Sequence, residues 1–536
     1  MLTRPTRWML LRQAEPCIKN RDTNYFSQRR SHSQMPSTFT YTFDTPLYKG
    51  KSTLNTGLFI NGEFVDPVDD AKIDVVNPST GKVITSVSAG SDKDVDIAVR
   101  AAKQAYKTSW GLKVPGTVRG RMLGKLADLI EKNADEFAAL EALNVGKPFV
   151  IARMADVAST IETIRYYAGW ADKIQGKVIE TNDKKLSYTR HEPYGVVGQI
   201  VPWNYPLSMV SWKIGPALAT GNVIVLKPSE LTPLTALKLA GLCNEAGFPP
   251  GVINIVNGYG HTVGQAISEH PVIEKIAFTG STATGRKIQV ASAMSNLKTV
   301  TLELGGKSPN IIFDDADLEQ AVKWATQSIF GNMGQNCNAG SRIFVQEGIY
   351  DKFLPMFTET ARSLQSATGD PFQPSTKHGP QVSQTQFNRV MGYIDSAKTD
   401  GANVHIGGSR HGSEGYFIQP TIVTECTPDM KIVQEEVFGP VAAVIKFKTE
   451  EEVIEMANDT VYGLSSAVFT ESSSRAVRVA HALEAGQAFV NCLNSVEKNM
   501  PFGGYKQSGI GRELGEYAID MYTQVKAVHI NVGLKL

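Results

Sequence analysis

Continuously apolar runs alternate with helical patterns through the middle of the chain. The runs at 223–226, 252–256 and 276–278 consist almost entirely of aliphatic and aromatic residues, which is typical of strands buried on both faces. Between the first two runs, Pro233 begins a helical segment and Gly247 ends it. Buried strands joined by helices predict an α/β fold with a doubly wound parallel sheet.

The flanking regions extend this pattern. Residues 58–63 form a hairpin-like strand with an Asn-Gly turn, and we expect the folded part to begin there. Ser91 and Asp94 make a capping box before a helix. The face expected to be buried holds Ile97, Ala98, Ala101, Ala102 and Ala105. From about 308 to 507 the alternation returns, which predicts a second α/β domain.

Composition narrows the class of protein. The chain has 536 residues, more than one hydrophobic core usually holds, so we expect two or more domains. A net charge of +1 gives no reason to expect nucleic acid as a partner. The five cysteines are scattered without metal-binding spacing, so we expect neither a metal site nor a disulfide framework. The most apolar region, 195–226, is interrupted by prolines and Lys213, so we expect no membrane span.

The first 35 residues are rich in arginine, serine and threonine and poor in acids. This composition is typical of a mitochondrial transit peptide, although Pro5 interrupts the amphipathic helix that such a signal usually forms. A disordered tail and a true start at Met35 are the alternatives. The predicted compartment therefore stays open between the cytoplasm and the mitochondrial matrix.

Two segments have features of a nucleotide site. Gly280, Ser281 and Gly285 follow a strand and open a helix, where free N–H groups favour phosphate. The glycine spacing differs from the usual dinucleotide fingerprint, so a simple strand-to-helix turn explains this segment equally well. Lys227 and Glu230 follow another strand at the edge where α/β sheets bind nucleotides.

The carboxylate of Glu230 suggests which nucleotide would bind. A carboxylate can accept hydrogen bonds from the 2′-hydroxyl of an adenosine ribose and would repel a 2′-phosphate, which favours NAD over NADP. A solvated Lys–Glu pair in a loop is the alternative reading of Lys227 and Glu230.

Three polar residues have the chemistry of acyl transfer. Cys337 lies between Gly334 and Gly340, which a core strand or helix would not favour, although a buried structural cysteine is the usual finding. Glu303 lies in an apolar run, where a carboxylate without a role or a partner would be costly to bury. Asn204 lies in Pro-Trp-Asn-Tyr-Pro, where it could also cap a turn. A thiol, a carboxylate and an amide can attack a carbonyl, activate water and stabilise an oxyanion.

With these segments the chain resembles the aldehyde dehydrogenase superfamily from about 57 to 534, in particular its classical, fungal-like NAD-dependent members. The resemblance is carried by Pro-Trp-Asn-Tyr-Pro, Lys-Pro-Ser-Glu, Phe-Thr-Gly-Ser, Leu-Glu-Leu-Gly-Gly-Lys, Gly-Gln-x-Cys-x-Ala-Gly-Ser-Arg, Glu-Glu-Val-Phe-Gly-Pro and Pro-Phe-Gly-Gly-Tyr-Lys-x-Ser-Gly. So many motifs in family order make the resemblance specific.

The resemblance implies oxidation of an aldehyde to the carboxylic acid with NAD and water. Cys337 would form a thiohemiacetal and then a thioester, Asn204 would hold the oxyanion and Glu303 would activate the water. Lys213 and Glu513 match a pair that supports proton movement away from the base. The positions implied for NAD are Ile200, Trp203, Lys227, Ser229, Glu230, Gly280, Ser281, Gly285, Glu436 and Phe438. A catalytically idle relative and a coenzyme A-acylating enzyme are the alternatives, and the latter generally lacks the base.

The resemblance also suggests a substrate tunnel. Its positions are Tyr205, Met209, Trp212, Phe330, Asn336, Asn338, Val496 and Phe502. Gly331 stands where relatives that oxidise betaine aldehyde often have an aromatic residue, and Val496 replaces a bulkier aromatic residue. We therefore expect a wide tunnel. No Arg or Lys is placed clearly to bind the carboxylate of a semialdehyde, so we expect a neutral aliphatic or aromatic aldehyde.

The implied domain organisation has four parts. Residues 1–50 form the extension, 51–183 and 194–305 the NAD-binding domain, and 306–522 the catalytic domain. Residues 184–193 and 523–534 form a small β oligomerisation element, because both segments have the pattern of exposed alternating strands. Such strand edges can pair between chains, so we expect a homodimer or homotetramer.

Overall fold

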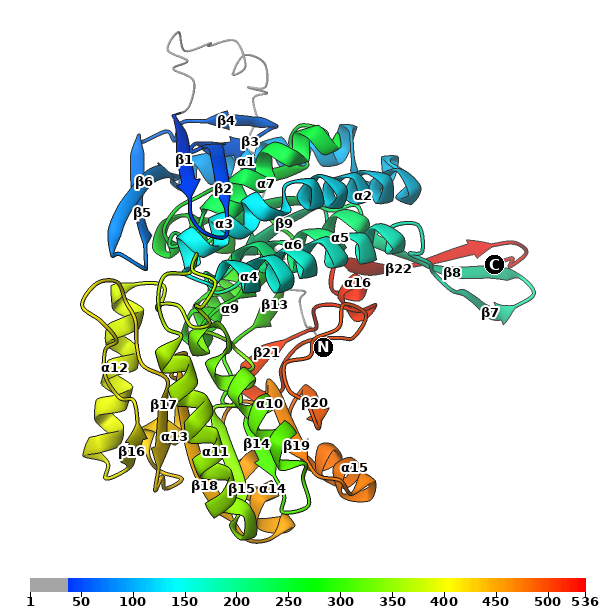
Figure 1. Ribbon diagram of the computed structural model, residues 1–536. Coiled ribbons are helices and arrows are strands. Elements are labelled where there is room, and N and C mark those ends of the chain that lie inside the picture. The colour runs from blue at the N-terminus through cyan, green and yellow to red at the C-terminus, as the bar shows by residue number, and fades with distance from the viewer. Residues whose placement is uncertain (1–36) are drawn as a thin grey trace, which may run out of the picture. The chain divides into compact units, whose positions relative to one another are not determined.

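The computed structural model describes residues 37–536, and a doubly wound sheet occupies the upper half of the view in Figure 1. Its strands run in the order β21-β13-β12-β9-β10-β11-β3-β4. Their bounds are β3 Leu58–Ile60, β4 Glu63–Val65, β9 Val196–Ile200, β10 Val223–Lys227, β11 Ile253–Ile255, β12 Lys275–Thr279, β13 Thr299–Glu303 and β21 Gly509–Ile510. Strands β9 to β13 are parallel. Strands β10 and β11 lie on one side of β9, whereas β12 and β13 lie on its other side. The winding of the sheet therefore reverses between β9 and β12. The predicted doubly wound sheet is confirmed.

Helices cover both faces of this sheet. They are α1 Asp92–Thr108, α2 Gly116–Lys132, α3 Ala134–Val145, α4 Phe149–Ile151, α5 Ala158–Trp170, α6 Pro206–Ala219, α7 Leu234–Ala246, α8 Gln265–Glu269 and α9 Thr282–Ser295. The predicted capping box of Ser91 and Asp94 begins α1, and the predicted Gly247 ends α7 in a left-handed conformation. The predicted face of α1 is partly wrong, because Val95 and Val99 are buried while Ile97 is 40% exposed.

A hairpin precedes the predicted start of the folded part. Strand β1 (Thr38–Asp44) pairs antiparallel with β2 (Lys49–Asn55), and Phe43 and Leu54 are buried. The prediction that the fold begins near residue 58 is therefore wrong, and an extension of 1–50 is too long, because these strands bury aromatic and aliphatic side chains. The predicted transit peptide lies outside the described residues.

A second parallel sheet occupies the lower half of Figure 1. Its strand order is β16-β17-β18-β15-β14-β19-β20, and only β16 is antiparallel to its neighbour. The strands are β14 Pro309–Ile312, β15 Arg342–Gln346, β16 Asn403–Ile406, β17 Thr421–Thr424, β18 Val441–Phe447, β19 Ser465–Phe469 and β20 Gln487–Val490. The helices around it are α10 Leu318–Phe330, α11 Glu347–Ser366, α12 Gln384–Thr399, α13 Lys431–Gln434, α14 Glu450–Asn458 and α15 Ser473–Ala482. The second α/β sheet is as predicted.

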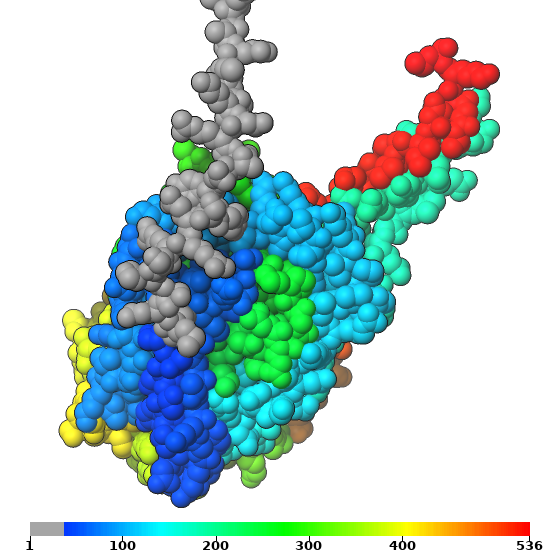
Figure 2. Space-filling model, turned by 90° about the horizontal axis from the view of Figure 1, so that it is seen from above, coloured from blue at the N-terminus to red at the C-terminus, as the bar shows by residue number. Residues whose placement is uncertain are grey.

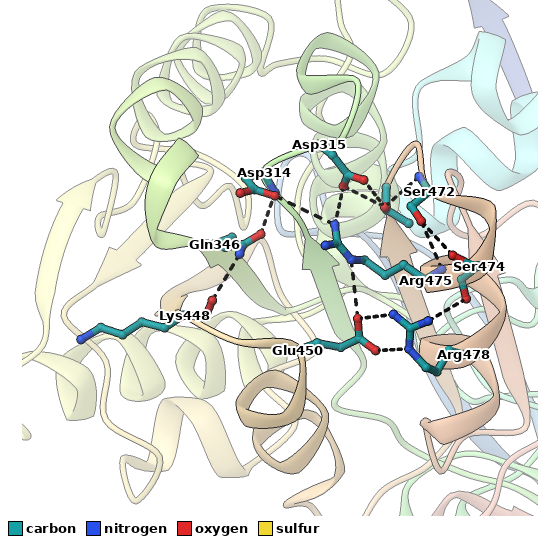
Figure 3. Close-up of polar contacts among 10 residues, drawn as sticks. Asp314, Asp315, Gln346, Lys448, Glu450, Ser472, Ser474, Arg475 and Arg478 are labelled. Carbon is teal, nitrogen blue, oxygen red and sulfur yellow. Dashed lines mark hydrogen bonds and ion pairs between the residues drawn. The ribbon is translucent and has the colours of Figure 1, made fainter.

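The second sheet also reverses its winding, between β14 and β19, but ion pairs fill that edge (Figure 3). Arg475, at the start of α15, lies 2.9 Å from Asp315 and 3.5 Å from Glu450. Glu450 also accepts two hydrogen bonds from Arg478, at 2.6 and 2.8 Å. Because these charges are paired with one another, the reversal point of the first sheet is the better place to look for a ligand.

The chain returns to the first sheet before it ends. Strand β21 pairs with β13, and helix α16 (Tyr517–Met521) follows it. Leu514 and Tyr522 are buried in the same apolar core as the helices of the first sheet. Residues 509–522 therefore pack with the first sheet, although the predicted division assigned them to the catalytic domain. The division into domains otherwise stays a prediction.

A small three-stranded sheet stands away from the two large sheets (Figures 1 and 2). It has the order β22-β8-β7, with β7 Val178–Asn182, β8 Lys185–Pro193 and β22 Thr523–Asn531. All of β7 and most of β22 are exposed. A further hairpin joins β5 (Ala71–Asn77) to β6 (Lys82–Ala89). Within residues 37–536, no helix is long and apolar enough to cross a membrane.

Candidate active site

Cys337 lies in a loop that begins with a strained turn after helix α10. Asn332 and Met333 have φ of 48° and 57°, a left-handed conformation that residues with a side chain rarely adopt. Gly334 follows with a φ of 70°, and a Cβ atom there would lie 2.0 Å from the carbonyl oxygen of Gly439. Strain of this kind persists only where surrounding contacts hold it, and it is often found at functional sites.

Side-chain amides hold this loop in place. The amide of Asn332 donates to the carbonyl oxygen of Asn204 at 3.1 Å and to that of Gln335 at 3.0 Å. The side-chain oxygen of Gln335 accepts from the backbone N–H of Val382 at 2.9 Å. The loop is therefore attached both to the segment after β9 and to a segment of the second half of the chain.

The thiol of Cys337 is half-buried rather than fully open. Burial raises its pKa well above the ordinary value, and the nearby carboxylates Glu303 and Glu436 raise it further. Backbone N–H groups of Asn338 and of Cys337 itself act in the opposite direction. Behind the loop, a Cβ atom on Gly306 would lie 2.4 Å from the carbonyl oxygen of Cys337, so only glycine allows this approach.

Asn204 lies just beyond the carboxyl end of β9 and is 5% exposed. Its amide donates a hydrogen bond of 3.0 Å to the carbonyl oxygen of Gln335, two residues before Cys337. An amide nitrogen carries two hydrogens, so one remains for a ligand oxygen near Cys337. The structure thus brings the predicted amide to the predicted nucleophile.

Glu303 is the last residue of β13 and is 3% exposed. Among the described residues, its Oε1 atom has no hydrogen-bond partner. Burial raises the pKa of Glu303 well above the ordinary value; Glu513 raises it further, while Lys213 lowers it. A carboxyl group with a raised pKa is suited to accept and release a proton near neutral pH.

The predicted pair of Lys213 and Glu513 is present and lies close enough to Glu303 to affect its pKa. Lys213, from α6, is fully buried and donates a hydrogen bond to Glu513. The Lys213 ammonium also donates to the hydroxyl of Thr279 at 2.7 Å, at the end of β12 beside β13. These groups connect the neighbourhood of Glu303 to the residues after β21.

The carboxyl end of β10 holds the predicted ribose contacts. Lys227 is 2% exposed and donates to Glu230 at 2.9 Å and to the Pro228 carbonyl oxygen at 3.0 Å. Burial lowers the pKa of Lys227, whereas Glu230 raises it. The side chain of Glu230 is 32% exposed, so its carboxylate can still receive a hydroxyl group. Ser229 is buried, and its hydroxyl accepts from the Leu231 N–H at 3.3 Å.

The carboxyl end of β12 leads directly into helix α9. Ser281 caps this helix and accepts a hydrogen bond from the N–H of Thr284 at 3.3 Å. The first turn contains no acidic residue, and Ser281 is exposed. A Cβ atom on Gly285 would lie 2.6 Å from Leu304, so this glycine allows the helix to pack against the loop after Glu303. An open N-terminus without acids suits a phosphate group.

Two predicted cofactor residues of the second sheet lie opposite this edge. Glu436 accepts a hydrogen bond of 3.0 Å from the N–H of Gly306, and burial raises the pKa of Glu436 to about 7. The ring of Phe438 meets that of Trp203 edge to face, with centroids 5.2 Å apart. Ile200, 8% exposed, is the last residue of β9 and precedes Trp203 by three positions. Candidate cofactor residues of the two halves of the chain therefore meet where Phe438 contacts Trp203 and where Glu436 contacts Gly306.

Comparison with known proteins decides the family. The model of the Aldehyde dehydrogenase family matches residues 64–528. The chain belongs to the aldehyde dehydrogenase family. An aldehyde dehydrogenase of Agaricus bisporus is 62% identical over 502 residues, which cover 94% of this chain and 100% of that protein. The mitochondrial aldehyde dehydrogenase of Homo sapiens is 52% identical over 480 residues, 89% of this chain and 92% of that protein.

Solved structures agree with the family. An aldehyde dehydrogenase from Bacillus cereus in complex with NAD+ is 49% identical, with a TM-score of 0.88, and the match covers 89% of this chain and 97% of that one. The predicted family, fold and enzyme class are therefore confirmed.

In this aldehyde dehydrogenase, the predicted tunnel residues differ from one another in burial and in the side chains that they contact. Trp212 and Phe502 meet edge to face, with ring centroids 5.1 Å apart. Phe330 stacks on Phe357 at 5.7 Å and belongs to the core of the second sheet. Val496 and Asn336 are half-buried, while Asn338 is 3% exposed.

Sequence reasoning missed the residues that support the site. Asn332 and Gln335 lie close to Cys337 in the sequence, and their side-chain amides could have indicated that they hold the Cys337 loop by hydrogen bonds. Arg389 donates to the backbone carbonyl of Glu436 at 3.1 Å, and nothing in the local sequence points to that role. Lys147 was also missed, because its contact with Tyr205 joins segments distant in the sequence.

Proposed function

We propose that this aldehyde dehydrogenase oxidises an aldehyde to the carboxylic acid with NAD and water, with Cys337 as nucleophile, Asn204 as oxyanion donor and Glu303 as base. The observation that carries the proposal is the meeting of these residues at the edge where the first sheet reverses its winding. The Cys337 loop is hydrogen-bonded to both the backbone carbonyl and the side-chain amide of Asn204. Glu303 lies close enough to Cys337 to raise the pKa of the thiol.

The residues divide the reaction between them. Cys337 attacks the aldehyde carbon as the thiolate, and the resulting oxyanion accepts hydrogen bonds from Asn204 and from the backbone N–H of Cys337. NAD, when bound, provides the acceptor for the hydride that leaves this carbon. A thioester then joins the acyl group to Cys337. The carboxylate of Glu303 takes a proton from a water molecule while the water oxygen attacks the thioester carbon. The C–S bond then breaks, which releases the carboxylic acid and leaves Cys337 as the thiolate.

Proton handling follows from the burial of both groups. Burial raises the pKa values of both Cys337 and Glu303 and so disfavours their charged forms, whereas the proposed reaction uses a thiolate and a carboxylate. Lys213 opposes the rise in the Glu303 pKa, and it is paired with Glu513. We propose that this pair helps a proton to leave Glu303 after each water is activated.

NAD fits the residues at this edge. Glu230 has room to accept from a ribose hydroxyl, and the N-terminus of α9 at Ser281 suits the pyrophosphate. Phe438 packs against Trp203 and Glu436 is hydrogen-bonded to Gly306, which supports our proposal that Glu436 and Phe438 contact the nicotinamide end. The Bacillus cereus relative is an NAD+ complex, which supports the same cofactor here.

An aldehyde panel tests this function. Wild-type protein with NAD should form NADH with at least one neutral aliphatic or aromatic aldehyde and need no coenzyme A. Cys337→Ala should lose this activity and still bind NAD, while Cys492→Ser, a change of another half-buried thiol, should keep it. NADH formation that requires coenzyme A would favour an acylating enzyme. Bound NAD without NADH formation from any aldehyde would favour a catalytically idle protein.

We propose that the small sheet of β7, β8 and β22 joins copies of the chain into a homodimer or homotetramer. Both edge strands of this sheet are exposed, and unpaired strand edges can pair with another chain. Val178 on β7 is 79% exposed and Val525 on β22 is 63% exposed, so both edge strands have an apolar side chain available to a second chain.

The compartment is a choice between the cytoplasm and the mitochondrial matrix. The basic composition of residues 1–35 and the mitochondrial relative of Homo sapiens support the matrix. Fusion of residues 1–35 to a fluorescent protein tests the compartment. Import into mitochondria would support the matrix, and diffuse fluorescence would support the cytoplasm.

A further inference from the structure

A cluster of three buried charged residues lies behind the segment that carries Asn204. Lys147, Asp156 and Glu141 are 1%, 2% and 0% exposed. The ammonium of Lys147 is hydrogen-bonded to the carboxylate of Asp156. One lysine thus faces two carboxyl groups in a place that water does not reach. Burial raises the pKa of both carboxyl groups, while Lys147 lowers them.

The cluster holds the start of helix α6 from several sides. The Lys147 ammonium lies over the ring of Tyr205, 3.7 Å from its centroid. The carboxylate of Glu141 accepts from the N–H of Leu207 at 3.1 Å. The backbone carbonyl of Asp156 accepts from the hydroxyl of Ser208 at 3.1 Å. All three contacts fall on the residues that directly follow Asn204.

The backbone around the cluster also favours a fixed geometry. Asp156 lies in a π-helical turn, Ala152–Val157, an insertion that is frequent at functional sites. Gly146, directly before Lys147, has a φ of 86°, and a Cβ atom there would lie 2.5 Å from Pro380. Lys147 therefore sits where the helices of the first sheet meet the segment that also holds Gln335.

A contribution to stability alone does not account for this arrangement. Burying an ion pair costs desolvation that its attraction barely offsets, and replacing both partners by uncharged residues is often neutral or stabilising. An ammonium over an aromatic ring, in contrast, gives a directional contact that is strongest when water is excluded. The contact falls on the residue next to Asn204, whose amide must be aimed accurately to stabilise an oxyanion.

We infer that Lys147 is a positioning residue of the oxyanion site: its ammonium, held by Asp156, fixes the ring of Tyr205 and thereby keeps the amide of Asn204 aimed at the aldehyde carbonyl. This inference rests on the proposed function. Glu141 supports the same segment by accepting a hydrogen bond from the N–H of Leu207, the first N–H group of α6.

Substitutions of Lys147 test the inference if the unfolding midpoint and kcat are measured separately for each variant. Lys147→Met removes the ammonium but leaves Asp156 buried and unpaired, so this variant should unfold more easily. Lys147→Met/Asp156→Asn has no unpaired charge at either position and should recover the unfolding midpoint. Both variants should lose about 10- to 100-fold in kcat, with KM and NAD affinity close to wild type. Lys147→Arg, which keeps a cation over the ring, should recover part of kcat.

The matched control is Lys238→Met. Lys238 forms a partly buried ion pair with Glu136 at 2.6 Å, and within residues 37–536 no hydrogen bond or ion pair joins either residue to Tyr205. This control should keep the wild-type kcat. A folded Lys147→Met/Asp156→Asn variant with the wild-type kcat would overturn the inference.

A double-mutant cycle with Tyr205 tests the proposed path of the effect. Once Tyr205→Leu has removed the ring, Lys147→Met should cause little further loss of kcat, because the two residues act through one contact. Fully additive losses would contradict the path through Tyr205.

A structural measurement separates this inference from the proposed function. If the wild-type protein oxidises no aldehyde, the proposed function fails, and crystal structures still decide the role of Lys147. A displaced Tyr205 ring and Asn204 amide in the Lys147→Met/Asp156→Asn variant would support positioning. An unmoved ring and amide would overturn it.

Discussion

The carboxylate of Glu436 accepts a hydrogen bond of 3.0 Å from the backbone N–H of Gly306. This contact joins the second sheet to the loop between Glu303 and β14, and it orients a carboxylate proposed to hold the nicotinamide end of NAD. Gly305 makes the approach possible, because a Cβ atom there would lie 2.4 Å from the Glu436 carboxylate.

Gly305→Ala should therefore displace the Glu436 side chain. The atom in the way is the end of a flexible side chain, so the fold should survive while the hydrogen bond is lost. We expect NAD binding to weaken by about tenfold, measured by titration. Gly392→Ala in α12 is the control, because nothing lies within 4 Å of the added atom. Unchanged NAD affinity in the Gly305 variant would remove Glu436 from the cofactor site.

Glu303→Gln should separate the two halves of the proposed reaction. The amide keeps the shape of the side chain but cannot take a proton from water. Mixing the variant with NAD and aldehyde should give a first burst of NADH, about one per active site, followed by a steady rate at least about 100-fold below wild type. Wild-type steady turnover would show that another group activates the water.

The pattern of local residues predicts much of the fold. Buried parallel strands appear as continuous apolar runs, so β10 and β12 could be read directly from the sequence. The β1–β2 hairpin was missed, although Phe39, Tyr41 and Phe43 alternate with threonines, because it adjoins the basic first segment. The return of β21 to the first sheet is a pairing between distant segments, which local patterns do not report.

The site divides in the same way. Cys337, Glu303 and Asn204 could be proposed from their chemistry and from the resemblance. The supporting roles of Asn332 and Lys147 could not be predicted from the sequence. The contact of Asn332 with Asn204 spans 128 positions along the chain, and that of Lys147 with Tyr205 spans 58. Half-burial of the Cys337 thiol likewise depends on packing rather than on the small residues beside it.

Glu303→Gln should also stabilise the protein, with a sign that follows from its raised pKa. Between the ordinary pKa of a glutamate and the raised one, the folded state keeps a proton that the unfolded chain has released. The free energy of unfolding therefore falls as the pH rises through that interval. Glutamine removes this loss, and we expect a gain of about 1–3 kcal/mol at neutral pH and above, with little gain below the ordinary pKa of glutamate.

Denaturant unfolding at several pH values measures this gain. Glu451→Gln is the control, since Glu451 is exposed on α14. It should show no such pH-dependent gain. A Glu303→Gln variant that is no more stable at high pH than wild type would mean that other groups offset the free-energy cost of ionising Glu303 in the folded protein.

The exposed edge of β22 gives the last prediction. Val525 is 63% exposed and Ile530 is 41% exposed, and charges on an edge strand oppose pairing with another chain. Val525→Lys/Ile530→Lys should therefore shift the protein from an oligomer toward the monomer mass of 58.3 kDa, measured by light scattering. Val477→Lys on α15, where the valine is 55% exposed, should leave the mass of the oligomer unchanged. If the β22 variant keeps the wild-type mass, copies of the chain associate through a different surface.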